Sequence, residues 1–275
     1  MKLQVVAATL VLNAFAVAAA TANAQSGGNI AVPSAAPNSY AGASFGSPIA
    51  FGASWGSVGI GVYGQTLPDS FNGQQFPELD GEVDGSAALI FGLGDADKYV
   101  GFETAVVTTS LTGENNKYSG AGDDDDFGES GGLSFKLHTN LPGGAAAAVG
   151  VIGTSRWGNA EDQNESSVYA NVSKVFSIDT GTRRHALVTT VGVGDGAFTN
   201  DFDDDGVNVF GSLAFYFTRQ YSLIVDHGGR FTNVGLSAAP ITGIPLTVTL
   251  GAINVGERFD SDVQFGGTLG YTFSF

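Results

Sequence analysis

The chain has 275 residues, with 27 acidic against 11 basic side chains, a formal net charge of −16 and no cysteine. This composition excludes disulfides, thiol chemistry and thiolate metal sites, and it disfavours nucleic acid and other polyanions as partners. The 41 glycines and 20 phenylalanines, with only 14% charged residues, are typical of strands and tight turns with an aromatic exterior.

The first 24 residues have the features of a secretory signal peptide. Lys2 precedes an apolar run over residues 5–19, and residues 22–24, Ala-Asn-Ala, have the small-x-small pattern of a cleavage site. We expect cleavage after Ala24. No later stretch has the ~18–20 uninterrupted apolar residues of a spanning helix, so an integral membrane form of this chain would be a closed barrel.

Residues 25–45 are rich in Ser, Gly, Pro, Asn and Ala and show no sustained period, which is typical of a flexible tether. We therefore expect a signal peptide (1–24), a flexible periplasmic segment (25–45) and an outer-membrane barrel (46–275). Residues 49–55 have some strand character. We interpret them as an extension of the first strand or as a lid segment, because single-chain bacterial barrels have even strand numbers.

Beyond residue 56, apolar and polar residues alternate in runs that turn residues separate, as in strands whose side chains point to opposite faces. We predict an all-β fold, an antiparallel transmembrane β-barrel of about twelve strands, within a range of ten to fourteen. The predicted strands are residues 57–64, 83–93, 99–111, 131–141, 145–157, 166–177, 185–197, 207–218, 221–227, 230–239, 245–254 and 263–275.

The predicted connections alternate between long, acidic or polar loops and compact turns, as in bacterial barrels with outer loops and periplasmic turns. An even strand number then places both the N-terminus and the C-terminus in the periplasm. Residues 227–230, His-Gly-Gly-Arg, are the exception, a tight hairpin on the long-loop side. The long connections are residues 65–82, 112–130, 158–165, 198–206 and 255–262.

The alternation places five ionisable side chains on the inner face. Such groups either line a narrow water-filled path or pair with one another and fill the bore. Twelve strands enclose far less room than the 16–18 of general porins, so a permeant would be small. The five inner residues are Glu103, Lys136, His138, Arg156 and Asp226.

An acidic run in a predicted outer loop has the D-x-D-x-D-G spacing that begins a calcium loop, with Asp201, Asp203 and Asp205 as candidate ligands. Position 12 of such a loop is a glutamate, whereas this chain has Ser212, so a solvated acidic loop is the alternative. With residues 123–126 the run would make a negative mouth that enriches cations and binds Ca²⁺ or Mg²⁺ loosely. We expect no other cofactor.

An enzyme is not indicated. The three histidines are His138, His185 and His227, and no Ser and Asn partners can be assigned to any of them. Twelve-stranded outer-membrane phospholipases use a Ser/His/Asn set on the outer face, whereas the alternation puts His138 inside.

The last strand is amphipathic, and its length suits a membrane strand of ~9–11 tilted residues. Its terminal phenylalanine, preceded by alternating aromatics, resembles the C-terminal signal of bacterial outer-membrane β-barrels. The resemblance implies that the barrel assembly machinery recognises Tyr271, Phe273 and Phe275. It also implies a location in the cell outer membrane, with outer-membrane lipid and lipopolysaccharide as partners.

Residues 221–230, with 233–237 and 245–246, resemble the repeated hairpin of the exopolysaccharide-associated outer-membrane barrel family. That family has an acidic residue and an aromatic before the glycine turn, where this chain has Asp226 and His227. The resemblance implies fold and location and names no transport substrate.

We predict from the sequence a monomeric or weakly oligomeric outer-membrane barrel that forms a narrow, porin-like channel for small cations or neutral solutes. Two alternatives stay open. One is a closed structural or envelope-interaction barrel, linked to exopolysaccharide export. The other is a carrier of lipids or hydrophobic solutes, which would need a wide apolar bore and a lateral gap.

Overall fold

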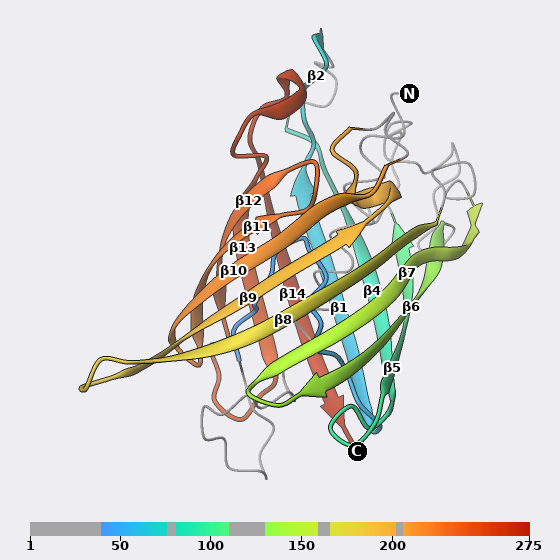
Figure 1. Ribbon diagram of the computed structural model, residues 1–275. Coiled ribbons are helices and arrows are strands. Elements are labelled where there is room, and N and C mark those ends of the chain that lie inside the picture. Colours follow the sequence, from blue (N-terminus) through green and yellow to red (C-terminus); the bar gives the residue numbers. More distant parts are fainter. Residues whose placement is uncertain (1–39, 76–80, 110–129, 159–165, 202–205) are drawn as a thin grey trace.

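The computed structural model describes residues 40–75, 81–109, 130–158, 166–201 and 206–275. Its main feature is a closed barrel of twelve antiparallel strands (Figure 1). Strands that follow one another in the barrel pair with each other, and β1 closes the ring by pairing with both β4 and β14. The barrel strands are β1 (Ser57–Thr66), β4 (Val83–Gly94), β5 (Gly101–Thr109), β6 (Gly131–Leu141), β7 (Ala145–Trp157), β8 (Ser167–Asp179), β9 (Arg184–Gly194), β10 (Asn208–Thr218), β11 (Tyr221–His227), β12 (Thr232–Ala238), β13 (Leu246–Ile253) and β14 (Gln264–Ser274).

The predicted fold class is confirmed. All twelve predicted strands are present, and their ends agree with the prediction to within three residues. In the described part of the chain, no helix is long and apolar enough to cross a membrane.

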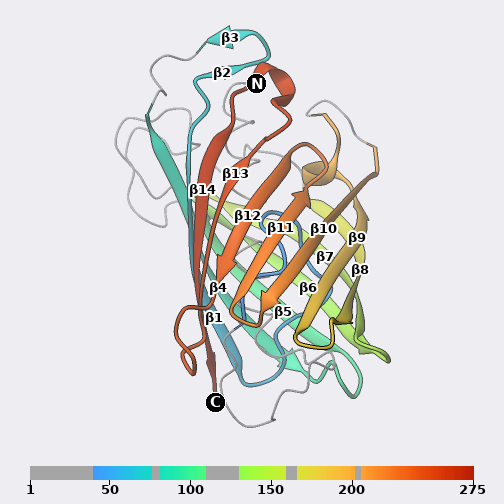
Figure 2. The same cartoon turned by 90° about the vertical axis from the view of Figure 1, so that its left-hand side faces the viewer.

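The connections give the barrel two different ends. We call the lower end in Figure 1, which carries the short turns and the C-terminus, the turn end, and the opposite end the loop end. At the loop end, the connection from β1 to β4 contains a small hairpin of β2 (Ser70–Phe71) and β3 (Gln74–Gln75), at the top of Figure 2. The tight turn predicted at residues 227–230 is present among the longer connections, since only residues 228–231 separate β11 from β12.

The two faces of the wall have opposite character. Large apolar side chains such as Leu236, Leu250 and Phe265 are more than 60% exposed on the outside. Their polar neighbours Ser237 and Thr249 point inward and are buried, as the two-residue period of a strand requires. An apolar exterior around a polar interior is the distribution of a barrel that spans a membrane, and the inverse of a soluble barrel.

Residues 40–56, which we call the inner segment, enter the bore before β1 begins (blue in Figures 1 and 2). Near its start, the Ala41 N–H donates to Arg219 O in the turn between β10 and β11. Near its other end, the Trp55 N–H donates to Gly94 O, where β4 ends. Both ends of the inner segment therefore lie at the turn end of the barrel, and the residues between them, 41–53, are buried.

The inner segment corrects two predictions. Residues 40–45 are not a flexible tether outside the barrel, because they are buried against its inner wall. Residues 49–55 neither extend β1 nor form a lid, because they cross the bore without strand pairing. Residues 25–39 and the predicted signal peptide lie outside the described residues.

Candidate functional site: the bore and its inner segment

Wall side chains hold the inner segment through its backbone carbonyl groups. The donors come from five strands, β6, β8, β10, β11 and β13, so the segment is tied to much of the circumference. Each bond is between residues that lie 85 or more positions apart in the chain. Seven carbonyls are held in this way: Tyr40 by Thr247, Ala41 by Tyr216, Gly42 by Ser222, Ala43 by Ser212, Pro48 by Asn171, Phe51 by Lys136 and Ala53 by His138.

Other wall side chains accept hydrogen bonds from the N–H groups of the same segment. They are hydroxyls and carboxylates, which are the acceptors that a polar wall can offer. Because buried N–H and C=O groups need partners, this matching permits an irregular segment to lie inside the barrel. The donor and acceptor pairs are Gly42 with Ser237, Ser47 with Asp226, Ala50 with Ser173 and Ala53 with Glu103, at 2.7–2.9 Å.

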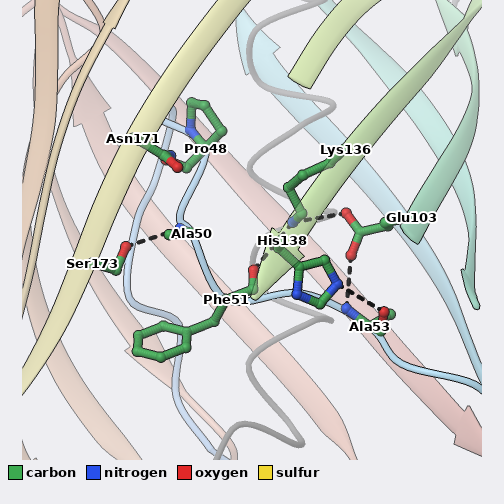
Figure 3. A network of polar contacts seen from close by, with 9 residues as sticks. All are labelled: Pro48, Ala50, Phe51, Ala53, Glu103, Lys136, His138, Asn171 and Ser173. Carbon is green, nitrogen blue, oxygen red and sulfur yellow. Dashed lines mark hydrogen bonds and ion pairs between the residues drawn. The ribbon is translucent and has the colours of Figure 1, made fainter. Parts of the chain in front are cut away.

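A buried ion pair lies beside the returning half of the segment (Figure 3). Lys136 Nζ of β6 is 2.9 Å from Glu103 Oε1 of β5, and both side chains are at most 5% exposed. Each partner also binds the segment, since Lys136 Nζ donates to Phe51 O at 3.1 Å and Glu103 Oε2 accepts the Ala53 N–H at 2.8 Å. Their charges cancel, so the pair fills the bore without adding net charge.

The ring of His138 lies against the inner segment at Gly52. A Cβ atom at position 52 would stand only 2.6 Å from the ring, and one at Gly101 on the wall only 2.5 Å from it. His138 Nε2 lies 3.0 Å from Ala53 O, so this nitrogen carries the proton. Glycine is therefore required at both positions by close approach.

Asp226 of β11 holds the tip of the inner segment, where the chain turns back. Its Oδ2 accepts the Ser44 O–H at 2.6 Å and the Ser47 N–H at 2.9 Å. The Asn233 side chain of β12 is 3.4 Å from Oδ1. The carboxylate is 1% exposed, so these neutral donors take the place of water around a buried charge.

Three aromatic rings fill the bore toward the loop end. Phe198, in a short 3₁₀ turn (Gly196–Phe198) of the β9–β10 connection, stacks on Phe210 of β10, with ring centroids 4.4 Å apart. Tyr169 of β8 lies edge-on to both rings, at 5.6 and 6.1 Å. All three residues are at most 2% exposed, so this aromatic layer occupies the bore on the loop-end side of the inner segment.

Two arginines tie the β9–β10 connection over the bore. Arg230, in the tight turn after β11, donates from Nη2 to Gly196 O and to Thr199 Oγ1, both at 2.8 Å. Arg258 donates to Arg230 O and to Asn200 O. The tight Gly-Gly turn thus places a cation where it anchors the loop that carries Phe198.

The predicted inner residues differ in their roles. Glu103, Lys136, His138 and Asp226 are all buried on the inner wall, where they contact the inner segment rather than an open path. Arg156 is half-buried near the loop end of β7, with its guanidinium over Gly153. The alternation found the wall positions, but the residues that occupy the bore carry no period that would predict them.

The other predicted sites lie outside the bore or the described residues. Asp201 is exposed at the loop end, whereas Asp203, Asp205 and residues 123–126 lie outside the described residues. Among the described residues, no group of three or more His, Asp or Glu side chains is placed to hold a metal ion. Tyr271 and Phe273 lie on the outer face of β14, with ring centroids 4.6 Å apart, and Phe275 is 89% exposed at the turn end.

The fold and the bore define the class of the protein, which is a transmembrane β-barrel with a segment of its own chain inside the bore. No family model and no curated protein matches the sequence, and the resemblance to the exopolysaccharide-associated family stays a prediction. Among solved structures, the fold is similar to an outer-membrane channel from Pseudomonas putida F1. That match has 12% identity, a TM-score of 0.46 and a coverage of 80% of this chain and 96% of the other.

Two further structures are similar at the same level. LpxR from Salmonella typhimurium matches with 12% identity and a TM-score of 0.41, over 80% of this chain and 100% of that chain. The transport unit of the autotransporter AIDA-I from Escherichia coli matches with 13% identity and a TM-score of 0.39, over 80% of this chain and 90% of that chain. Each likeness is one of barrel architecture alone.

Proposed function

We propose that the protein is an outer-membrane channel for small polar solutes or cations, and that the described state is its closed state. The observation that supports this proposal is the polar and charged character of the wall beneath the inner segment. The segment fills this space in the closed state, so a wall that only had to pack against it could be apolar. The wall side chains bind the segment mainly through backbone atoms, and water can replace such bonds at a net cost of about 0.5–1.5 kcal/mol each. Departure of the segment would leave a wettable bore.

The proposed location follows from the outer surface and the two ends. The apolar exterior needs lipid, and a barrel with long loops at one end and short turns at the other has the arrangement of bacterial outer-membrane barrels. We place the turn end in the periplasm, so that the inner segment enters and leaves from that side. The barrel assembly machinery and lipopolysaccharide are its expected partners.

A permanently closed barrel is the second candidate. The buried ion pair of Glu103 and Lys136 and the aromatic layer around Phe198 favour it, because both fill the bore with well-packed side chains. Such a barrel would serve the envelope as a structural or export-associated protein. A carrier of hydrophobic solutes is the least supported option, because most of the inner wall beneath the segment is polar.

Single-channel recording separates the two candidates. Replacing Gly52 by Leu forces a side chain into the His138 ring, and overpacking of about 1–3 kcal/mol should expel the inner segment and raise the open probability about tenfold or more. The matched control is G256L, because position 256 is exposed and a Cβ there meets nothing within 4 Å. If folded wild-type, G256L and G52L barrels are non-conducting, and F198A/G52L, which also removes a ring of the aromatic layer, is non-conducting as well, the protein is a permanently closed barrel.

A further inference from the structure

The wall groups that bind the inner segment indicate which other molecules the bore can bind. We propose that the wall of the bore is a binding site for a peptide that turns back on itself and has mostly small side chains, and that residues 40–53 occupy this site as its ligand in cis. This inference rests on the proposed function in one respect, namely that the inner segment can leave. It names short peptides as the substrate class of the channel.

The wall recognises the peptide group rather than particular side chains. At Gly42, Ser237 Oγ accepts the N–H at 2.7 Å and Ser222 O–H donates to the carbonyl at 2.6 Å. At Ala53, Glu103 accepts the N–H and His138 lies against the carbonyl. Two residues of the segment therefore have both backbone groups bound by two different wall side chains. Recognition through the main chain gives affinity that tolerates changes in ligand sequence.

The donor and acceptor arrangement fits peptides better than other small polar molecules. Wall donors such as Asn171 and Lys136 meet carbonyl oxygens, whereas the acceptors Ser173 and Glu103 meet N–H groups. A sugar offers hydroxyls, each of which can either donate or accept. It therefore does not need wall donors and acceptors in the fixed order that the N–H and C=O groups of a peptide need.

The space around the segment limits which side chains a ligand can carry. A Cβ at position 42 would stand 3.1 Å from Ser237 Oγ, and one at position 52 would stand 2.6 Å from the His138 ring. A large side chain is accommodated at Phe45, which is fully buried over Gly235 and Gly251 of the wall. The site thus admits glycine at two positions and an aromatic residue at a third, which sets the register of a bound peptide.

Binding of a labelled peptide tests the proposal without any measurement of current. The probe is a fluorescent synthetic peptide with the sequence of residues 40–54, and the receptor is the full-length G52L barrel, whose own segment is displaced. The G42L barrel is the second receptor, in case G52L does not fold. We expect anisotropy titrations to show at least tenfold tighter binding to these variants than to wild type, whose bore is occupied.

Two matched comparisons test the recognition itself. A probe peptide with leucine in place of both glycines should bind at least tenfold more weakly. Loss of one wall partner, as in S222A within the G52L barrel, should weaken the original peptide about fivefold, the effect of one hydrogen bond. Tetra-alanine should compete for the site, whereas a maltose oligosaccharide of similar size should not.

The results separate this inference from the proposed function. Equal binding of the probe to wild type and to folded G52L, or of the leucine-substituted peptide to the same receptor, would overturn the peptide site. If G52L binds the peptide but neither G52L nor F198A/G52L conducts, the channel is refuted and the peptide site stays intact. A barrel that conducts without binding the peptide would refute the peptide site and leave the channel intact.

Discussion

Gly42 lies so close to Ser237 that a Cβ atom at position 42 would stand 3.6 Å from the Cβ atom and 3.1 Å from the Oγ atom of Ser237. This separation is within the range of about 3.5–4.5 Å that a disulfide needs between its Cβ atoms. The chain contains no cysteine, so a single engineered pair would form without competition. The contact therefore offers a way to fix the inner segment to the wall.

The double variant G42C/S237C should form this disulfide and lock the bore. Oxidised barrels are expected to show at least tenfold lower open probability than the same barrels after reduction, because the segment cannot leave while the bond is intact. Bilayer recording before and after addition of dithiothreitol measures the change, with S237C alone as the control. Failure of the pair to oxidise in the folded barrel would mean that residue 42 does not lie against β12.

The ion pair of Glu103 and Lys136 should contribute to stability only as a pair. E103Q leaves the buried Lys136 ammonium without its counter-charge, and breaking a buried pair costs about 3–5 kcal/mol. The double variant E103Q/K136M should recover most of this loss, since no charge is left unpaired. Urea unfolding in detergent measures both values, and additive effects of the two substitutions would contradict the coupling.

Asp226 should hold the tip of the inner segment by its oxygens more than by its charge. D226N keeps an acceptor for the Ser44 hydroxyl and the Ser47 N–H, whereas D226A leaves these two groups only the bonds that Ser44 and Ser47 make with each other, at a cost of about 1 kcal/mol for each hydrogen bond lost. We expect D226A to raise the open probability about tenfold and D226N to change it severalfold less. An equal effect of both variants in bilayer recordings would show that the charge itself is what matters.

The strands were predictable because the two features that define a membrane strand, its apolar and polar alternation and the turn residues at its ends, are local in the sequence. The two-residue alternation in residues 263–275 and the turn signal in residues 142–144 are visible without any knowledge of distant residues. The inner segment was not predictable in this way. Residues 41–53 are mostly small and show no sustained two-residue period, and they are buried because wall groups far along the chain, such as Asp226 and Lys136, bind their backbone.

The wall did give one signal that pointed to an occupant. Glu103, Lys136, His138 and Asp226 all face inward in a barrel with a narrow bore, and buried charges need partners. Pairing between wall residues was one of the two interpretations of the sequence, and it holds for Glu103 with Lys136. The partners of His138 and Asp226 on the inner segment have no signature of their own, since they are backbone groups, which occur at every residue, and the hydroxyl of a single serine, Ser44.

The loop end should become more stable in acid because of Asp262. A hydrogen bond and charge repulsion from Asp69, with a smaller contribution from Glu257, raise the pKa of the exposed Asp262 carboxyl above its ordinary value. A raised pKa in the folded state favours the protonated form. The stabilisation is therefore complete below the ordinary value of about 3.9 and is lost as the pH rises through the raised pKa.

Proteolysis of the β13–β14 connection at different pH values checks this prediction. Cleavage within residues 254–263 should slow as the pH falls through the raised pKa of Asp262, with the protease rate corrected on an unstructured peptide. D262N at pH 7 should resemble the acid state of the wild type, because it keeps the hydrogen bond and removes the repulsion. Cleavage of D262N that keeps the wild-type pH dependence would assign the effect to another group.

The aromatic layer should act as a second closure in series with the inner segment. F198A removes the ring that stacks on Phe210 and contacts Tyr169, and loss of a buried phenylalanine costs about 3–5 kcal/mol. Protease should then cut the β9–β10 connection faster. V209A is the control, because Val209 is 60% exposed on the outer face of the same strand as Phe210.

Two closures in series predict a specific pattern of currents. F198A alone should stay mostly closed, because the inner segment still occupies the bore. G52L alone should conduct less than the double variant F198A/G52L, in which neither closure remains. If F198A alone conducts as well as the double variant, the inner segment is not a barrier to ions, and the aromatic layer around Phe198 is the gate.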